Sequence, residues 1–193
     1  MSLISENEFE NQSFKKKSCV GCKLRDKFFS YSVFENCDFT QCDFTSSKFL
    51  ECKMQSCNLS LTKLDEVRLQ DVTFEKCKLV GINFSKCEKM FLTVKFKDCL
   101  LDTCNFSDLD LKQTLFHKCQ IRDTYFTNCN LTSAEFSGSN LSGSTFHNTN
   151  LTKANFQEAI NYSINPLTNK LSKAHFSKPE VMRLLDHLDI IID

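Results

Sequence analysis

A five-residue repeat constrains this chain more than any other feature of its sequence. Between Phe29 and Phe84, every fifth residue is large and apolar, and no repeat is missed. The series is Phe29, Phe34, Phe39, Phe44, Phe49, Met54, Leu59, Leu64, Leu69, Phe74, Leu79 and Phe84. A period of five matches neither an α-helix, at about 3.6 residues per turn, nor a simple strand, at about two. The repeat therefore predicts a solenoid, in which each unit buries its core against its neighbours.

The residues around each large apolar position indicate a coil with four flat sides. Two positions earlier there is usually a small side chain, often Cys. Alternate residues of a short extended segment point the same way, so both positions are expected to face inward. Four such sides complete one coil, so every fourth repeat should return to the same side. Successive coils are expected to pair through their backbones at ~4.8 Å.

Residues one coil apart should then form ladders along the core. One predicted core ladder consists of Phe34, Met54, Phe74, Phe96, Phe116, Phe136 and Phe156. Phe74 and Phe96 are two positions farther apart than the other neighbours in this ladder, so two residues are inserted between them. Cys87 keeps the earlier phase and Phe91 has the later one, which predicts a small bulge at residues 86–90.

The pattern divides the chain into a coil over residues 1–176 and a C-terminal segment over residues 177–193. The repeat fades after Phe156, and Pro179 and Glu180 suit the first turn of a short α-helix. Apolar residues at helical spacing follow, and an isoleucine-rich tail ends the chain. We expect this segment to cap the open end of the core.

Charge and composition exclude several classes of protein. Lys plus Arg equals Asp plus Glu, at 24 each, so no net field attracts nucleic acid directly or draws the chain to an anionic membrane. No stretch approaches the ~18 apolar residues of a membrane span. The N-terminal residues lack the apolar segment of a secretory signal. With 12 Cys, the chain is expected to reside in a reducing cytoplasm.

The cysteines allow two interpretations. Eleven of the twelve occupy the small inward position: Cys22, Cys37, Cys42, Cys52, Cys57, Cys77, Cys87, Cys99, Cys104, Cys119 and Cys129. One interpretation is metal or redox chemistry; the other is a need for small buried side chains, which Ala134 and Ser139 also meet. No second Cys pair or His accompanies Cys19 and Cys22 at zinc spacing. The four His form no convergent set with Ser or Cys, so we expect no catalytic residue, cofactor or metal site.

The repeat unit resembles that of a known family. The segments Cys37-Asp38-Phe39-Thr40, Cys57-Asn58-Leu59-Ser60 and Cys129-Asn130-Leu131-Thr132 are similar to the motif of pentapeptide-repeat proteins, and the resemblance covers about residues 9–176. It implies an all-β fold, the right-handed quadrilateral parallel β-helix.

The C-terminal segment, from Ala174 to Leu185, is similar to the tail of Qnr-type (MfpA-like) pentapeptide-repeat proteins and their chromosomal relatives. This resemblance implies a homodimer formed through the C-terminal helix. The expected interface residues are Val181, Leu184, Leu185, Leu188, Ile190 and Ile191.

The same resemblance implies a function without catalysis. Qnr-type proteins are DNA mimics that bind DNA gyrase or topoisomerase IV and protect these enzymes from quinolones. The bulge residues Lys86, Glu88, Lys89 and Met90 are candidates for contacting such a partner. The candidates for an acidic, DNA-like stripe are Asp38, Asp43, Asp65, Asp71, Asp98, Asp102, Asp108 and Asp110. The alternative function is a structural or scaffolding module with a different protein partner.

Overall fold

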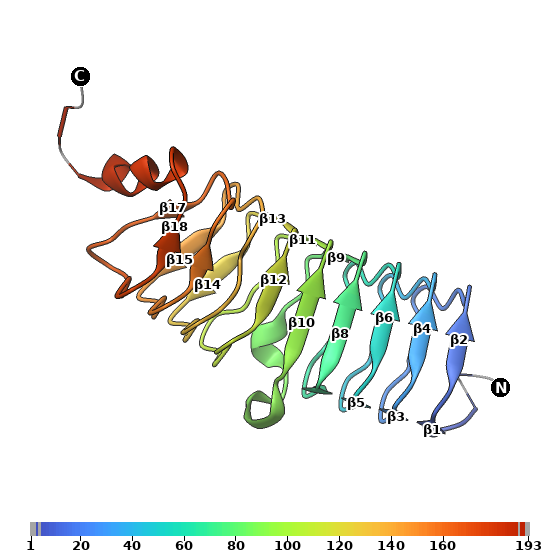
Figure 1. Cartoon of the computed structure of the whole chain (residues 1–193). Coiled ribbons are helices and arrows are strands. Elements are labelled where there is room, and N and C mark those ends of the chain that lie inside the picture. The colour runs from blue at the N-terminus through green and yellow to red at the C-terminus, as the bar shows by residue number, and fades with distance from the viewer. Residues whose placement is uncertain (1–2, 4, 189, 192–193) are drawn as a thin grey trace.

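The computed structural model describes residues 3, 5–188 and 190–191. Short parallel strands stack on one another and form one long rod (Figure 1). The first sheet contains β1 (Glu8–Glu10), β3 (Phe28–Ser30), β5 (Lys48–Leu50) and β7 (Arg68–Gln70). The second contains β2 (Ser13–Lys15), β4 (Val33–Glu35), β6 (Lys53–Gln55), β8 (Val72–Glu75), β10 (Val94–Lys97) and β12 (Leu115–His117). Strands β16 (Asn155–Phe156) and β18 (His175–Phe176) pair further along the rod.

Two further sheets complete the sides of the coil. One contains β9 (Lys78–Val80), β11 (Leu100–Asp102) and β13 (Gln120–Arg122). The other contains β14 (Tyr125–Thr127), β15 (Thr145–His147) and β17 (Ser163–Ile164). The remaining elements are three 3₁₀-helices within the described residues, η1 (Phe84–Lys86), η2 (Lys89–Phe91) and η3 (Glu180–His187). The sequence prediction of a parallel β-solenoid is confirmed.

Aromatic ladders fill the core. Phe116 lies between Phe96 and Phe136, with ring centroids 5.2 and 4.9 Å away and the rings nearly parallel. Phe126, on the neighbouring side, meets Phe116 edge-to-face at 5.7 Å and 86°. Stacking along each ladder and edge contacts between ladders are the two arrangements that aromatic rings prefer. The residues of the predicted core ladder are each no more than 1% exposed: Phe34, Met54, Phe74, Phe96, Phe116, Phe136 and Phe156.

The polar residues of the motif satisfy the backbone at each side of the coil. Asp38 Oδ1 accepts hydrogen bonds from the Thr40 amide and the Thr40 hydroxyl, at 3.0 and 2.6 Å. Asn58 accepts the same two bonds from Ser60. At these positions, a short side chain with an acceptor oxygen is favoured before the central apolar residue, and a hydroxyl is favoured after it. These hydrogen bonds explain why the repeat prefers Asp or Asn before that residue and Ser or Thr after it.

Most corners turn without glycine: the chain has only 4, all of which take positive φ, whereas many non-glycine residues take it as well. Lys16 and Gln41, for example, adopt φ values of 51° and 58° in the left-handed region. Such a conformation costs about 1–2 kcal/mol for an ordinary residue. The next coil compensates, because the Lys16 amide donates to Glu35 O and the Gln41 amide to Ser60 O, both at 2.8 Å.

The register between coils changes once in the middle of the rod. Met54 pairs with Phe74 at the regular step of one coil, whereas Phe74 pairs with Phe96, two positions beyond that step. The Glu88 amide still donates to Val67 O in the earlier register. The Thr93 amide, which donates to Leu69 O, has left that register. The extra residues therefore lie between Glu88 and Thr93, around η2, which overlaps the end of the predicted bulge at residues 86–90.

The C-terminal end is less regular. Phe146 pairs with Ile164, two positions short of the regular step, which returns between Phe156 and Phe176. A helix follows where one was expected, but η3 is a 3₁₀-helix rather than the expected α-helix. In a 3₁₀-helix residues three apart lie on one side. This places Arg183 beside Glu180, with Nε 2.6 Å from Oε2, and lets both reach Asn161 of the last coil.

We predict that removing a core ring destabilises the rod far more than removing its exposed neighbour. Phe126→Ala opens a cavity between Phe106 and Phe146 and should lower the free energy of unfolding by about 3–5 kcal/mol. Tyr125→Ala is the matched control, because Tyr125 is 53% exposed. Urea unfolding followed by circular dichroism measures both. Equal effects would contradict the stacked core.

Candidate interaction surfaces

The loop at η2 is braced by an arginine from the coil below. The Arg68 guanidinium donates to both carboxylate oxygens of Glu88, at 2.9 and 2.8 Å. Its central carbon lies 4.1 Å from the centroid of the Phe91 ring, a cation–π contact. The hydrogen bond from Arg68 lowers the pKa of Glu88. Arg68 thus holds the loop against β7 and fixes its direction.

The predicted bulge residues differ in whether their side chains are bound to the rod or exposed to a partner. Lys86 pairs with Asp65 at 2.9 Å, and Lys89 donates to the Asp108 carbonyl at 3.2 Å. Glu88 is held by Arg68, as described above. Met90 projects from the loop and is 83% exposed. Of these four side chains, Met90 is the one without a polar partner on the rod.

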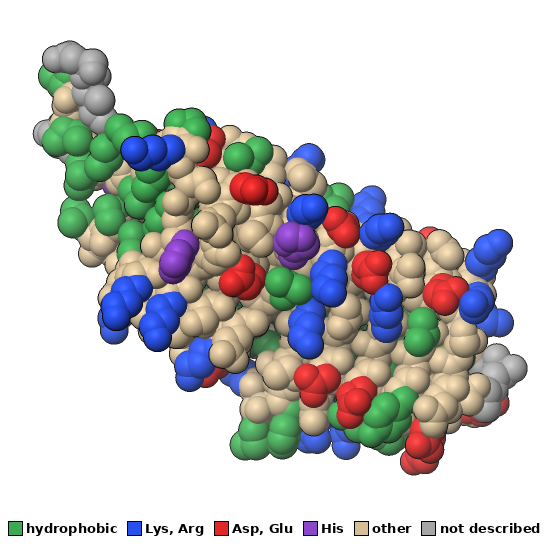
Figure 2. Space-filling view, in the orientation of Figure 1, with side chains coloured by type: hydrophobic (Ala, Val, Ile, Leu, Met, Phe, Trp, Pro, Cys, Tyr) green, Lys and Arg blue, Asp and Glu red, His purple; other side chains and the backbone are tan. Residues whose placement is uncertain are grey.

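An acidic face lies on the first sheet near the N-terminal end. Its exposed carboxylates, none of which forms a salt bridge within the described residues, are Glu8, Glu10, Asp26, Glu51 and Asp71. Apolar side chains lie among them: Phe28 and Leu50 are half-buried and Tyr31 is 48% exposed. Figure 2 shows red side chains around green ones along this edge of the rod. We call this surface the acidic face.

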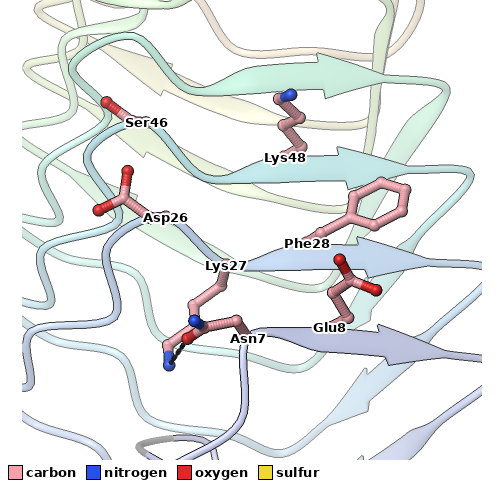
Figure 3. Close-up of a pocket in the computed structure, with 7 residues that line it drawn as sticks. All are labelled: Asn7, Glu8, Asp26, Lys27, Phe28, Ser46 and Lys48. Carbon is pink, nitrogen blue, oxygen red and sulfur yellow. Dashed lines mark hydrogen bonds between the residues drawn. The ribbon is translucent and has the colours of Figure 1, made fainter.

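Two shallow hollows adjoin Phe28 on the acidic face. The larger, of about 470 Å³, is lined by Asn7, Glu8, Asp26, Lys27, Phe28, Ser46 and Lys48 (Figure 3). Lys27 is buried there, and its ammonium donates to Asn7 Oδ1 at 2.8 Å and to the Glu6 carbonyl. The smaller hollow, of about 240 Å³, lies beside Tyr31 and Leu50. Glu8, Phe28 and Lys48 are register neighbours on three successive strands.

The aspartates proposed from the sequence do not form one acidic stripe. Asp38 and Asp43 pair in register with Asn58 and Lys63, on two different sides of the coil. Burial alone would raise the pKa of Asp43, but hydrogen bonds from Thr45 and Arg25 lower it to about 2. Other aspartates are engaged by lysines, as in Asp65 with Lys86. Sequence order hides these partners, because they lie about one coil away.

A basic row lies on the second sheet, around β10. Lys76, Lys95, Lys97 and Lys118 are exposed there and form no salt bridge within the described chain. Figure 2 shows a group of blue side chains across the middle of the rod. The neutral total charge therefore includes an acidic group on the first sheet and a basic group around β10, with exposed charges of both signs elsewhere.

The predicted dimer residues sit on and after η3. Val181, Leu184, Leu185 and Leu188 are half-buried, and Leu184 packs against the chain's own core. Ile190 and Ile191 are 53% and 92% exposed. Green side chains gather at this end of the rod in Figure 2.

Below this helix, Tyr162 is fully buried. Its hydroxyl has no hydrogen-bond partner within the described residues. Burial raises the pKa of Tyr162 to about 12, and the nearby Glu180 carboxylate contributes to the rise.

Inward cysteines are small side chains whose thiols donate hydrogen bonds to backbone carbonyls. The thiols of Cys37, Cys57 and Cys77 each donate to a carbonyl of the preceding coil, at 3.2–3.4 Å. Serine and threonine do the same, as in Ser139 to Phe116 O at 2.6 Å. No group of three or more His, Cys, Asp or Glu within the described residues is arranged to hold a metal ion. In the same part of the chain, no helix has the length and apolarity to cross a membrane.

A model of the "Pentapeptide repeat region" matches three overlapping segments, residues 27–106, 47–126 and 89–176. The chain belongs to the pentapeptide-repeat family. No curated protein sequence matches it.

Solved pentapeptide-repeat structures share its fold. Two trypsin-treated variants of QnrB1, a plasmid-mediated fluoroquinolone resistance protein, match with TM-scores of 0.60 and 0.58 at 18% identity. Each alignment covers 97% of this chain and 98% of the QnrB1 chain. HetL, a pentapeptide-repeat protein involved in heterocyst differentiation regulation from the cyanobacterium Nostoc sp. strain PCC 7120, matches with a TM-score of 0.51 at 17% identity. That alignment covers 89% of this chain and 87% of HetL.

We predict that Arg68 controls the order of the η2 loop. Arg68→Ala removes the two hydrogen bonds to Glu88 and the contact with Phe91, so amides 88–93 should exchange about three- to tenfold faster. Hydrogen exchange with mass spectrometry measures this change. The control is Lys53→Ala, which breaks the 2.7 Å pair with Glu75 on the second sheet. Loop exchange that stays at the wild-type rate in Arg68→Ala would show that Arg68 does not brace the loop.

Proposed function

We propose that this pentapeptide-repeat protein is a non-enzymatic rod that binds DNA gyrase or topoisomerase IV and protects the enzyme from fluoroquinolones. The acidic face supports this proposal most directly. Its unpaired carboxylates, with the exposed Lys48 among them, present mainly negative charge on a rigid surface, which a DNA-binding groove lined with cations would accept. The proposal places the protein in the cytoplasm, where it would meet these enzymes.

The apolar side chains at the centre of the acidic face, together with the η2 loop, would make binding of the partner more specific than charge alone. Tyr31, Phe28 and Leu50 offer area that a partner can bury, and aromatic anchors usually carry much of the binding energy. Met90 projects from a loop that packs on β7 of the same sheet. A partner on the acidic face would therefore reach Met90 as well.

The proposed assembly is a homodimer formed through the C-terminal segment. The helix leaves Met182 48% exposed, and Ile190 and Ile191 extend beyond it. Burying such residues against a second copy removes apolar surface from water. Leu184 contributes mainly to the chain's own cap, so we assign the contact between copies chiefly to Leu188, Ile190 and Ile191.

The second candidate function is a scaffold for a different protein. The basic row on the second sheet favours it, because a DNA mimic has no evident use for unpaired lysines at the middle of the rod. A partner with an acidic surface would suit Lys95 and Lys97. The gyrase experiment below separates the two functions.

We predict that the purified protein raises the fluoroquinolone concentration needed to inhibit gyrase supercoiling. Replacing Glu10, Glu51 and Asp71 together by Lys should weaken this protection roughly tenfold, because the acidic face then repels cations. The control makes the same change in charge at three exposed carboxylates on other sides of the coil: Asp98, Asp123 and Glu158. If the wild-type protein does not change drug inhibition of gyrase or of topoisomerase IV, this function is refuted. The scaffold for a different protein then remains as the candidate function.

We predict a dimer in solution that depends on the tail. The variant with Ile190→Asp and Ile191→Asp should show half the wild-type mass in light scattering, because two charges per chain enter an apolar contact. Leu61→Asp is the control, since Leu61 is 52% exposed but far from the C-terminal end. A wild-type monomer, or a variant of unchanged mass, would contradict the proposed assembly.

A further inference from the structure

Cys19 and Cys22 lie at the two ends of one tight turn near the start of the rod. The Cys22 amide donates to the Cys19 carbonyl at 3.0 Å and closes the turn Cys19-Val20-Gly21-Cys22. A turn closed in this way brings its first and fourth Cα atoms within about 7 Å, and disulfides span about 4.4–6.8 Å. Gly21 takes φ +67° and has nothing within 4 Å of the site where a Cβ would be, so the turn is open to solvent.

These two thiols differ from most of the ladder thiols farther along the rod. Cys37, Cys52, Cys57, Cys77, Cys99, Cys104 and Cys129 each donate to a carbonyl of the preceding coil. Cys19 and Cys22 lie in the first coil that the structure describes, so no earlier coil covers them there. Within the described residues, neither Cys19 nor Cys22 donates its thiol to a backbone carbonyl.

Both thiols also lie at the core: Cys19 belongs to the buried core, and Cys22 packs against it. Cys19 occupies a central core position, where the regular coils mostly carry Phe or Leu. Burial, the largest cause, and the nearby Cys22 thiol together raise the pKa of Cys19 to about 11. Cys22 is half-buried, whereas Cys19 is only 9% exposed. An oxidant therefore meets Cys22 first.

A third cysteine, Cys42, lies one coil above Cys22. Its thiol donates to the Cys19 carbonyl at 2.6 Å and is fully buried. This hydrogen bond points the Cys42 sulfur at the backbone of the turn. In addition, thiols stacked between coils have parallel Cα–Cβ directions, which suit a disulfide poorly. The geometry favours a bond within the turn over a bond between coils.

We propose that Cys19 and Cys22 are a redox modification site, at which hydrogen peroxide converts two thiols into a reversible disulfide across the turn. The Cys22 thiolate attacks the peroxide, takes one oxygen to become a sulfenic acid, and the other oxygen leaves as water after protonation. The Cys19 sulfur then attacks the Cys22 sulfur, an S–S bond forms, and the sulfenic oxygen leaves as a second water. The two thiols lose two electrons, which reduce one peroxide.

The test uses the intact, folded protein with limiting peroxide, rapid alkylation of remaining thiols and tryptic mass mapping. Residues 18–23 form a single tryptic peptide, which follows Lys17 and ends at Lys23. We expect this peptide to lose about 2 Da and to carry no alkyl group, and dithiothreitol should restore both alkylation sites. The peptides with Cys37, Cys57 and Cys77 should stay fully alkylated at the same dose.

Two variants complete the test. Cys22→Ser should leave Cys19 reduced, because the buried thiol has lost its reactive neighbour. Cys42→Ser removes the competing thiol and should leave the disulfide of residues 18–23 at the wild-type yield. A Cys22–Cys42 disulfide, oxygen addition without a disulfide, or oxidation of all 12 Cys at one rate would overturn the proposal.

Discussion

Backbone pairing between successive coils is the interaction on which the rest of this structure depends. A single coil has too little interior to be stable alone, and its left-handed corner residues are unfavourable in isolation. Neighbouring coils supply an acceptor for the corner amide, a ring for the aromatic ladder and a partner for inward polar groups such as the Ser139 hydroxyl. Stability therefore comes from repetition in register, and residues such as Phe116 contribute through contacts with both neighbours.

Much of the fold could be predicted from the sequence, because the five-residue period decides which side chains face inward. The positions of Phe34, Met54 and Phe74 in one buried ladder follow from that period alone. The hydrogen-bonding type of η3 did not follow, since the spacing of apolar residues over eight positions does not separate a 3₁₀-helix from an α-helix. The contacts of the candidate interaction surfaces were harder to predict than the fold. Arg68 lies one regular coil before Glu88, a spacing that could have revealed the brace on the η2 loop, but the contact with Phe91 required the altered register.

The charge distribution is the feature that total composition concealed. Twenty-four cations balance 24 anions, yet the acidic face collects unpaired carboxylates around Tyr31 and the basic row collects lysines around β10. Because each side of the coil takes one five-residue block in every four, neighbours in sequence lie on different sides. Under the proposed function, residues one coil apart select the partner together with the η2 loop and the C-terminal segment, where the repeat is interrupted.

The most direct measurement of the proposed function is hydroxyl-radical footprinting of the protein in the presence and absence of gyrase. Tyr31 and Met90 are exposed, readily oxidised side chains on and beside the acidic face, whereas Tyr125 is exposed on another side of the coil. We predict that gyrase protects Tyr31 and Met90 while Tyr125 reacts at an unchanged rate. Protection of Tyr125 with Tyr31 and Met90 left reactive would place the partner on a different surface and contradict the account.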